Sequence, residues 1–230
     1  EGNGVAAAGA GGGFNQRGRR QLVHACQHGP HHQIGEVGRD PAAWLVDELN
    51  ALGFAAELRP TPGHPMVVAH GDALADPASA APSLLFYGHY DVQPVDPLNL
   101  WNADPFAPAV ETLPDGRRVI RARGAVDDKG QLMTFIEACR AWKAETGTLP
   151  AKISILFEGE EESGSPSLIP FLEANREELS RDLALICDTG MFDPKTPAIS
   201  TMLRGMMGEE ITVKAASRAL GAFTGMSSAG

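Results

Sequence analysis

The sequence predicts a layered α/β fold, in which the strands of one sheet alternate along the chain with helices. Three apolar segments, Ser83–Tyr87, Ile153–Phe157 and Leu183–Cys187, have the length of buried strands and are too short for helices. Each of them is followed directly by acidic or imidazole side chains. Because parallel strands end at one edge of a sheet, and ligands bind at that edge in open α/β folds, we expect the functional site there.

The other elements follow from local signals. A helix is predicted to begin at Asp40-Pro41, because Asp is a favoured N-cap and proline is favoured at the first helical position, and to end at Gly53. A hairpin turn is predicted at Pro114-Asp115-Gly116. Further helices are predicted at Lys129–Glu145 and Ser167–Ala174, and further strands at Phe54–Leu58, Met66–Ala69, Ala198–Met202 and Ile211–Lys214.

Residues 1–40 differ from the rest of the chain, because they carry glycine and arginine runs and little hydrophobic periodicity. We expect this segment to be weakly ordered. It contains four histidines, but their spacing fits none of the usual zinc motifs and no carboxylate pair lies nearby, which favours a solvated loop over a metal site. These histidines are His24, His28, His31 and His32.

Composition argues against several classes of function. The chain has 230 residues, a formal net charge of −10 and a pI near 5.1, which argues against partners such as nucleic acid or an anionic membrane. No run approaches the ~20 apolar residues of a membrane-spanning helix. Three widely spaced cysteines form no disulfide framework, which fits a reducing, cytoplasmic compartment. Of these, Cys139 and Cys187 lie in apolar segments and are expected to be buried.

Four groups of polar side chains are expected to meet at one edge of the sheet. His89 and Asp91 follow the first apolar segment, Glu158–Glu162 the second and Asp188 the third, while Asp127-Asp128 precede a helix. So many carboxylates cannot all stay ionised together without cations, because like charges raise each other's pKa. One imidazole with several carboxylates suits zinc, with Mn²⁺ or Co²⁺ as alternatives. The pattern predicts a two-metal hydrolase.

Each group also has a structural explanation by itself. The five residues after the second strand could form a solvated acidic loop, and Asp127 and Asp128 could cap the helix that follows them. His89 could be an ordinary loop histidine, and Asp188 could belong to a plain turn. The metal site is favoured because all four groups coincide with a strand end or a helix start.

The motifs at these positions resemble those of peptidase family M20, the co-catalytic zinc peptidases that include carnosinase, other dipeptidases, aminoacylase and glutamate carboxypeptidase. The resemblance covers roughly residues 41–215 and is strongest to the carnosinase-like dipeptidases. The deacylases of the family more often have Asp-Met-Lys-Gly where this chain has Asp127-Asp128-Lys129-Gly130. The matching motifs are Gly88-His89-Tyr90-Asp91-Val92-Gln93-Pro94, Trp101 with Asp104-Pro105-Phe106, Arg123-Gly124-Ala125-Val126-Asp127-Asp128-Lys129-Gly130, Glu158-Gly159-Glu160-Glu161-Glu162-Ser163-Gly164-Ser165 and Cys187-Asp188.

The resemblance implies a role for each of six side chains. Glu161 would be the general base, and Asp91 would hold the His89 imidazole in its orientation. The substrate would be a dipeptide or short peptide, or an N-acyl amino acid if the chain acts like the deacylases. The metal ligands would be His89 and Asp188 at one zinc ion, Glu162 at the other, and Asp127 between both.

The resemblance also implies a domain organisation. A weakly ordered or aberrant segment at 1–40 would precede an α/β/α catalytic domain at 41–204, and 205–230 would begin a lid, or dimerisation, domain that is mostly missing. In the family a further histidine near the C-terminus binds the second metal, and intact relatives form homodimers. Where the family has Arg-Asp-Leu-His-Ser-Gly, this chain has Arg218-Ala219-Leu220-Gly221. We therefore expect a truncated or frame-disrupted product, with an inactive fragment as the alternative to a working hydrolase.

Overall fold

The structure is a computed structural model that describes residues 5–8, 20, 23, 25, 40–193, 196, 198–205 and 207–212. The chain divides into two compact units, residues 1–198 and 199–230. All the helices and strands of the described residues belong to the first unit. The four histidines predicted to form a solvated loop, and Cys26, lie outside the described residues. The domain boundaries expected at 40 and 204 stay predictions.

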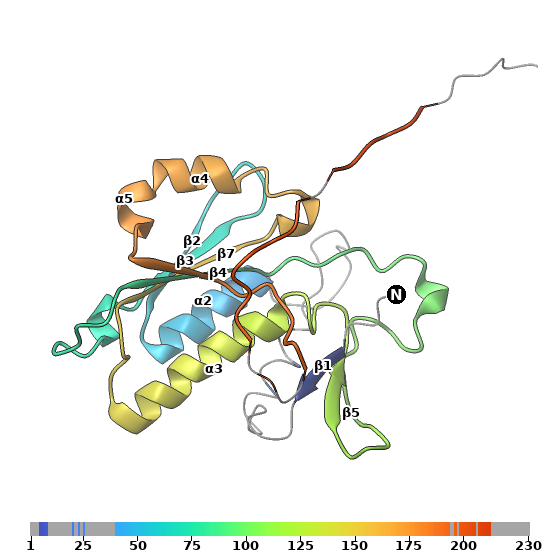
Figure 1. Cartoon of the computed structure of the whole chain (residues 1–230), viewed down its shortest axis with the longest axis horizontal. Helices are drawn as coiled ribbons and strands as arrows, with labels where there is room; N and C mark the ends of the chain where they lie inside the picture. Colours follow the sequence, from blue (N-terminus) through green and yellow to red (C-terminus); the bar gives the residue numbers. More distant parts are fainter. Residues whose placement is uncertain are drawn as a thin grey trace, which may run out of the picture. The chain divides into compact units, whose positions relative to one another are not determined.

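The first unit is built on a five-stranded mixed sheet with the order β2-β3-β7-β4-β8 (Figure 1). The pairs β7–β4 and β4–β8 are parallel, whereas β2–β3 and β3–β7 are antiparallel. The three apolar segments predicted to be neighbouring strands are therefore confirmed as parallel neighbours. The strands are β2 (Ala55–Arg59), β3 (Met66–His70), β4 (Leu84–His89), β7 (Ile153–Glu158) and β8 (Leu183–Ile186).

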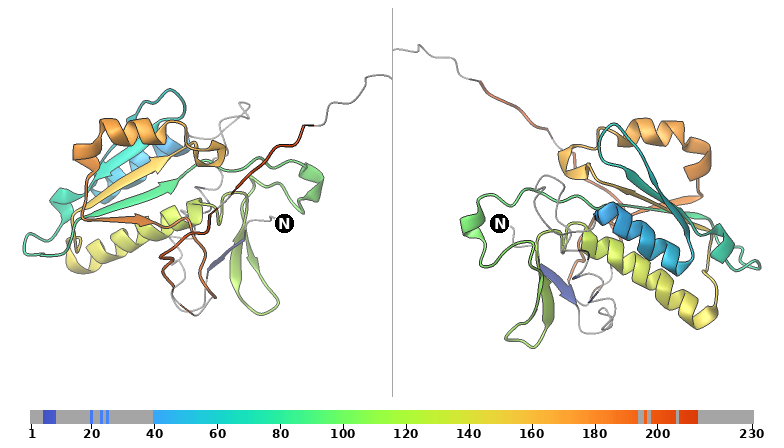
Figure 2. Two further views of the ribbon diagram at one scale, coloured as in Figure 1. Left: turned by 45° about the horizontal axis from the view of Figure 1, so that its top comes forward. Right: turned by 180° about the vertical axis from the view of Figure 1, so that it is seen from behind.

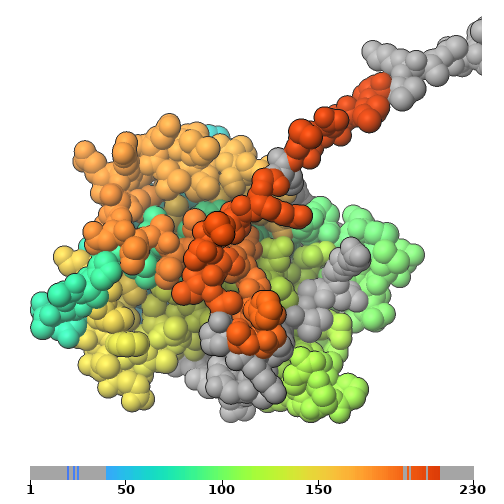
Figure 3. Space-filling model, in the orientation of Figure 1, coloured from blue at the N-terminus to red at the C-terminus, as the bar shows by residue number. Residues whose placement is uncertain are grey.

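Helices cover both faces of this sheet, which confirms the layered α/β/α prediction. Figure 2 shows α2 and α3 side by side on one face, with α4 and α5 on the other. The outer sides of α4 and α5 form part of the molecular surface (Figure 3). The helices are α2 (Pro41–Leu52), α3 (Lys129–Thr146), α4 (Leu168–Ala174) and α5 (Arg176–Leu179). None of the helices in the described part of the chain has the length and apolarity that crossing a membrane requires.

The predicted ends of α2 are confirmed by their contacts. The Asp40 side chain accepts a hydrogen bond from the Ala42 N–H at 3.0 Å, which satisfies one of the free N–H groups of the first turn. Gly53 ends the helix with φ 100°, in the left-handed region that favours glycine.

The core lies on both faces of the sheet, because successive side chains of a strand point to opposite sides. In β7, Ile155 and Phe157 pack with α2 and α3, whereas Leu156 packs in a smaller cluster with Leu179 of α5. All six residues of β7 are buried, as expected for a strand with a neighbour on each side. The loop that follows β7 is therefore attached to a strand that is buried along its whole length.

A second, three-stranded sheet has the order β1-β6-β5. Its hairpin turns at Pro114-Asp115-Gly116, as predicted, and Gly116 has φ 83°. The strand β1 was not expected, because it lies in the segment predicted to be weakly ordered; its four residues pair with the free edge of β6. The strands are β1 (Val5–Ala8), β5 (Ala109–Thr112) and β6 (Arg118–Arg121).

Three expectations about the C-terminal half are wrong. The strand β8 is not buried, because it lies at the edge of the sheet and Leu183 and Ile186 are 53% and 64% exposed. No strand forms at Ala198–Met202, whose residues are exposed and pair with no other described strand, and an unpaired strand leaves its backbone groups unsatisfied. Cys187 is only partly buried, whereas Cys139 is buried as predicted. Of the strand expected at 211–214, the described part, Ile211 and Thr212, is not in a strand.

The packing of α3 on the sheet predicts the effect of truncating Ile136, whose side chain is fully buried. Ile136→Ala should lower the free energy of unfolding by about 2–5 kcal/mol, because it removes apolar contacts and leaves a cavity. Urea denaturation measures this. The matched change Ile169→Ala, at a residue of α4 that is 67% exposed, should stay within about 0.5 kcal/mol. Equal effects of the two changes would contradict the packing described.

Candidate metal centre

The register between β4 and β7 places the first candidate ligand beside the acidic loop. His89, the last residue of β4, lies opposite Glu158, the last residue of β7. The His89 side chain is fully buried. Gly88 allows the start of α3 to approach this position, since a Cβ there would lie 2.2 Å from the Leu132 side chain and 2.8 Å from an Asp128 oxygen. The strand ends and the start of α3 therefore converge on His89.

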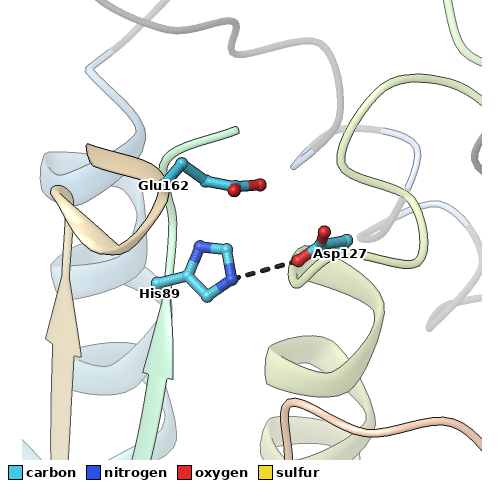
Figure 4. A group of neighbouring side chains, drawn as sticks. All are labelled: His89, Asp127 and Glu162. Atoms are coloured by element: carbon cyan, nitrogen blue, oxygen red, sulfur yellow. Dashed lines mark hydrogen bonds and ion pairs between the residues drawn. The ribbon is translucent and has the colours of Figure 1, made fainter. Parts of the chain in front are cut away.

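The Nε2 atom of His89 has three carboxylates within 4 Å. It lies 3.1 Å from Asp127 Oδ1, 3.8 Å from Asp188 Oδ2 and 3.9 Å from Glu161 Oε2. Figure 4 shows His89, Asp127 and Glu162 directed toward a common space from β4, the start of α3 and the loop after β7. These side chains form two groups that could hold a metal ion, with ligand atoms within 4.8 Å of one another: His89 with Asp127 and Glu162, and His89 with Glu161 and Asp188.

The structure thus brings together all six side chains that the sequence singled out. Their separate roles stay predictions. The two groups divide these side chains differently from the assignment that the resemblance implied. Glu162, expected at the ion that His89 does not bind, falls in a group with His89. Glu161, expected as a base, falls in a group with Asp188.

Asp91 fixes both the histidine and the acidic loop. Its Oδ1 lies 3.2 Å from His89 Nδ1, the geometry expected of a carboxylate that orients a metal-binding imidazole. The same carboxylate accepts the backbone N–H groups of Glu161 at 3.3 Å and Glu162 at 3.0 Å. One side chain therefore positions three of the candidate site residues.

The electrostatics of the cluster favour a bound cation. Burial lowers the pKa of His89, but hydrogen bonds to Asp127 and Asp91 outweigh it and raise that pKa to about 11. Burial raises the pKa of Glu161, Glu162 and Asp188. The imidazolium thus supplies positive charge to the carboxylates, and a metal ion would replace its proton, because a ligating histidine must be neutral.

The residues present fit a divalent metal ion. Their donors are one imidazole nitrogen and carboxylate oxygens, a set that zinc accepts. One carboxylate oxygen, Glu162 Oε1, is buried without a hydrogen-bond partner among the described residues, while the other accepts from Gln93 Nε2 at 2.6 Å. A buried oxygen without a partner is costly unless a ligand such as a metal ion satisfies it.

The four glutamates between Glu158 and Glu162 separate into two pairs, and the two that the resemblance singled out lie together. Glu161 and Glu162 join the cluster around His89. Glu158 instead accepts hydrogen bonds from the hydroxyls of Tyr87 and Ser165, and burial raises its pKa. Glu160 accepts two backbone N–H groups elsewhere. Glu158, at the end of β7, and Glu160, in the loop, therefore stabilise the fold around the site.

Asp128 is a buried neighbour of the site, and the sequence assigned it no role, whereas the resemblance made Asp127 a metal ligand. It is 1% exposed, its Oδ2 accepts the backbone N–H of His89 at 3.2 Å, and its Oδ1 is buried without a partner among the described residues. Burial raises its pKa to about 7. The Asp-Asp pair before a helix was the signal available, but it could not tell which residue is buried.

The contacts of Asp91 predict that Asp91→Asn weakens zinc binding about 10–100-fold. An asparagine side chain offers one acceptor oxygen where the carboxylate uses both to hold two backbone N–H groups. Zinc titration by calorimetry measures the affinity. Asp96→Asn, at an exposed position, is the control and should bind zinc like the parent protein. An unchanged affinity in Asp91→Asn would contradict this role.

The buried Asp128 predicts a dependence of stability on pH in the metal-free protein. The Asp128 carboxyl loses its proton near pH 3.8 in the unfolded chain but keeps it to about pH 7 in the folded state. The free energy of unfolding therefore falls as pH rises between these values. Asp128→Asn cannot ionise and keeps an acceptor for the His89 N–H. Between pH 4 and pH 8 it should lose up to about 4 kcal/mol less than the parent, at about 1.4 kcal/mol per pKa unit. Urea denaturation at both pH values measures this, and identical losses would refute it.

Known proteins resemble this chain in sequence. The model of peptidase family M20/M25/M40 matches residues 85–220, a range that includes all six candidate residues. The Cys-Gly metallodipeptidase dug1 of Schizosaccharomyces pombe is 33% identical over 196 residues, which cover 80% of this chain and 40% of that protein. The beta-Ala-His dipeptidase of Homo sapiens is 36% identical over 125 residues, which cover 54% of this chain and 24% of that protein.

A solved structure resembles the fold. The M20 family metallo-carboxypeptidase Sso-CP2 from Sulfolobus solfataricus matches with a TM-score of 0.66 and 33% identity, over 79% of this chain and 39% of that chain. The chain therefore spans less than half of the length of these relatives. Since the family match covers more than half of this chain and the structure carries the expected sheet and residue cluster, the chain belongs to peptidase family M20/M25/M40.

Proposed function

We propose that the protein is a zinc-dependent hydrolase that cleaves the amide bond of dipeptides or short peptides. The observation that carries this proposal is the convergence of one buried imidazole, His89, with four carboxylates in two groups that share it. The names of two relatives, a Cys-Gly metallodipeptidase and a beta-Ala-His dipeptidase, support dipeptides as the substrate class.

Zinc would be held by side chains from three strand ends and the start of α3. When bound, it supplies Lewis acidity that polarises a carbonyl group and makes water more acidic. Mn²⁺ and Co²⁺ are alternative ions for the same donors. The side chains that would hold the metal are His89, Asp127, Glu162 and Asp188.

Glu161 is the side chain best placed to move protons. It is 37% exposed, so a substrate and a water molecule can reach it, and burial raises its pKa toward the range in which a carboxylate can exchange protons. It would accept the proton of the water that attacks the amide carbonyl, and would then donate that proton to the leaving amine. Asp91 would keep His89 in its ligand orientation throughout.

A cytoplasmic location and homodimer formation also stay proposals. Among the described residues Cys139 and Cys187 are free thiols, which supports a reducing compartment. The sequence-based expectation of a dimer rests on the resemblance to the family.

The proposed function is tested by metal content together with hydrolysis. The purified chain should bind zinc after dialysis in metal-free buffer, and should hydrolyse Cys-Gly or beta-Ala-His in a reaction that a chelator abolishes and zinc restores. Cleavage of N-acetyl amino acids without cleavage of dipeptides would instead assign it to the deacylases. Zinc binding without any hydrolysis, or no zinc at all, would mean an inactive fragment.

Glu161→Gln should lower kcat about 10²–10⁴-fold and leave the zinc content per chain unchanged, because it removes a proton acceptor and keeps the side chain's size. Stopped assays of dipeptide hydrolysis and metal analysis measure the two quantities. The same substitution at Glu173, exposed on α4, is the matched control and should leave kcat unchanged. A variant at Glu161 that retains kcat would exclude this residue as the base.

A further inference from the structure

The side chain of Glu160 belongs to neither candidate metal-binding group, although the residue adjoins Glu161 and Glu162. It is 6% exposed, and its two carboxylate oxygens have separate partners. Oε1 accepts the backbone N–H of His64 at 3.1 Å, and Oε2 accepts the backbone N–H of Ser167 at 3.2 Å. His64 belongs to the turn between β2 and β3, and Ser167 immediately precedes α4. One buried carboxylate therefore joins three segments.

The turn between β2 and β3 is shaped to receive this carboxylate. It lies beside α4 in both Figures 1 and 2. A Cβ on Gly63 would lie 1.4 Å from Glu160 Oε1, a separation that no side chain could tolerate. Thr61 stabilises the turn by donating its hydroxyl to the His64 carbonyl at 2.7 Å and accepting the Gly63 N–H at 3.1 Å. The absence of a side chain at Gly63 therefore leaves the space that the Glu160 carboxylate occupies.

The backbone of Glu160 is held as firmly as its side chain. Its carbonyl oxygen accepts the N–H of Ser165 at 2.8 Å and the N–H of Ser163 at 3.1 Å. On the next two residues, the backbone N–H groups of Glu161 and Glu162 are held by Asp91. The loop is thus anchored from two sides, by Asp91 at the metal cluster and by Glu160 at the β2–β3 turn.

We propose that Glu160 is a positioning residue, which sets the direction of Glu161 and Glu162 by tying the acidic loop to the β2–β3 turn and to the residue before α4. This inference rests on the proposed function, in which Glu161 is the base and Glu162 a metal ligand. A ligand side chain must be held to within about 0.5 Å of its working position, and a short loop achieves this only through its supporting contacts. Glu160 supplies such contacts in addition to those of Asp91.

Glu160→Gln tests the role without changing the length of the side chain. The amide offers one acceptor oxygen and one NH₂ donor, so one of the two backbone N–H groups must face a donor. Amide hydrogen exchange of the metal-free protein, followed by mass spectrometry, should show about tenfold faster exchange or more in peptides covering residues 158–167, as for the loss of a hydrogen bond to a charged group. Peptides covering α3 should exchange as in the parent, which a general loss of stability would not produce.

Gly63→Ala tests the same anchor from its other end, because the added methyl group displaces the Glu160 carboxylate and leaves its charge intact. It should accelerate exchange in the same peptides. The controls are Glu173→Gln on α4, and Gly205→Ala, where a Cβ would meet no atom within 4 Å. Both should exchange like the parent protein.

Zinc affinity separates this inference from the proposed function. In a parent protein that binds zinc, Glu160→Gln should weaken binding about tenfold or more, the range seen when groups that orient ligands are lost. Loop exchange that stays at the parent rate in both variants would overturn the positioning role, whether or not zinc binds. A parent that binds no zinc but shows the predicted loop exchange would overturn the proposed function and retain Glu160 as the loop anchor.

Discussion

The parallel pairing of β4 with β7 is the interaction on which the rest of the site depends. It places His89 opposite Glu158, so that the imidazole and the acidic loop leave the sheet at the same point. The pairing is rigid because β7 is buried along its whole length between two neighbours and two helix layers. A shift by one residue would turn every side chain of β4 to the opposite face and remove His89 from the cluster.

The concentration of negative charge at this edge sets the chemistry of the site. Asp127, Glu161, Glu162 and Asp188 surround one imidazole, and the fold provides that imidazole as the local cation. Partial burial raises the pKa of Glu161 and Glu162, because charge away from water is costly. Burial lowers the pKa of His89, but its hydrogen bonds to Asp127 and Asp91 outweigh that effect and raise it. A metal ion would lower this cost, because its charge would neutralise the carboxylates.

Much of the sheet and of the site was predictable because the signals are local. Apolar runs of strand length located β4 and β7, and the residues directly after them located His89 and the acidic loop. The failures concern residues whose environment is set at a distance. The apolar run of β8 indicated burial, yet this strand lies at the edge of the sheet. Residues 198–202 were predicted to form a strand, but they have no pairing partner among the described strands. Hydrophobicity predicts a tendency to pair and pack, and the partners themselves come from the fold.

The sequence by itself indicated the family, the positions of the apolar strands along the chain and the set of side chains that could hold a metal, because these depend on residue type and on position relative to a strand end. Only the tertiary structure showed what the other two glutamates, Glu158 and Glu160, contact. Past the end of β7 the alternation of a strand no longer fixes side-chain direction. There the direction depends on hydrogen bonds to distant segments, such as the one from His64 to Glu160, 96 residues apart in the chain.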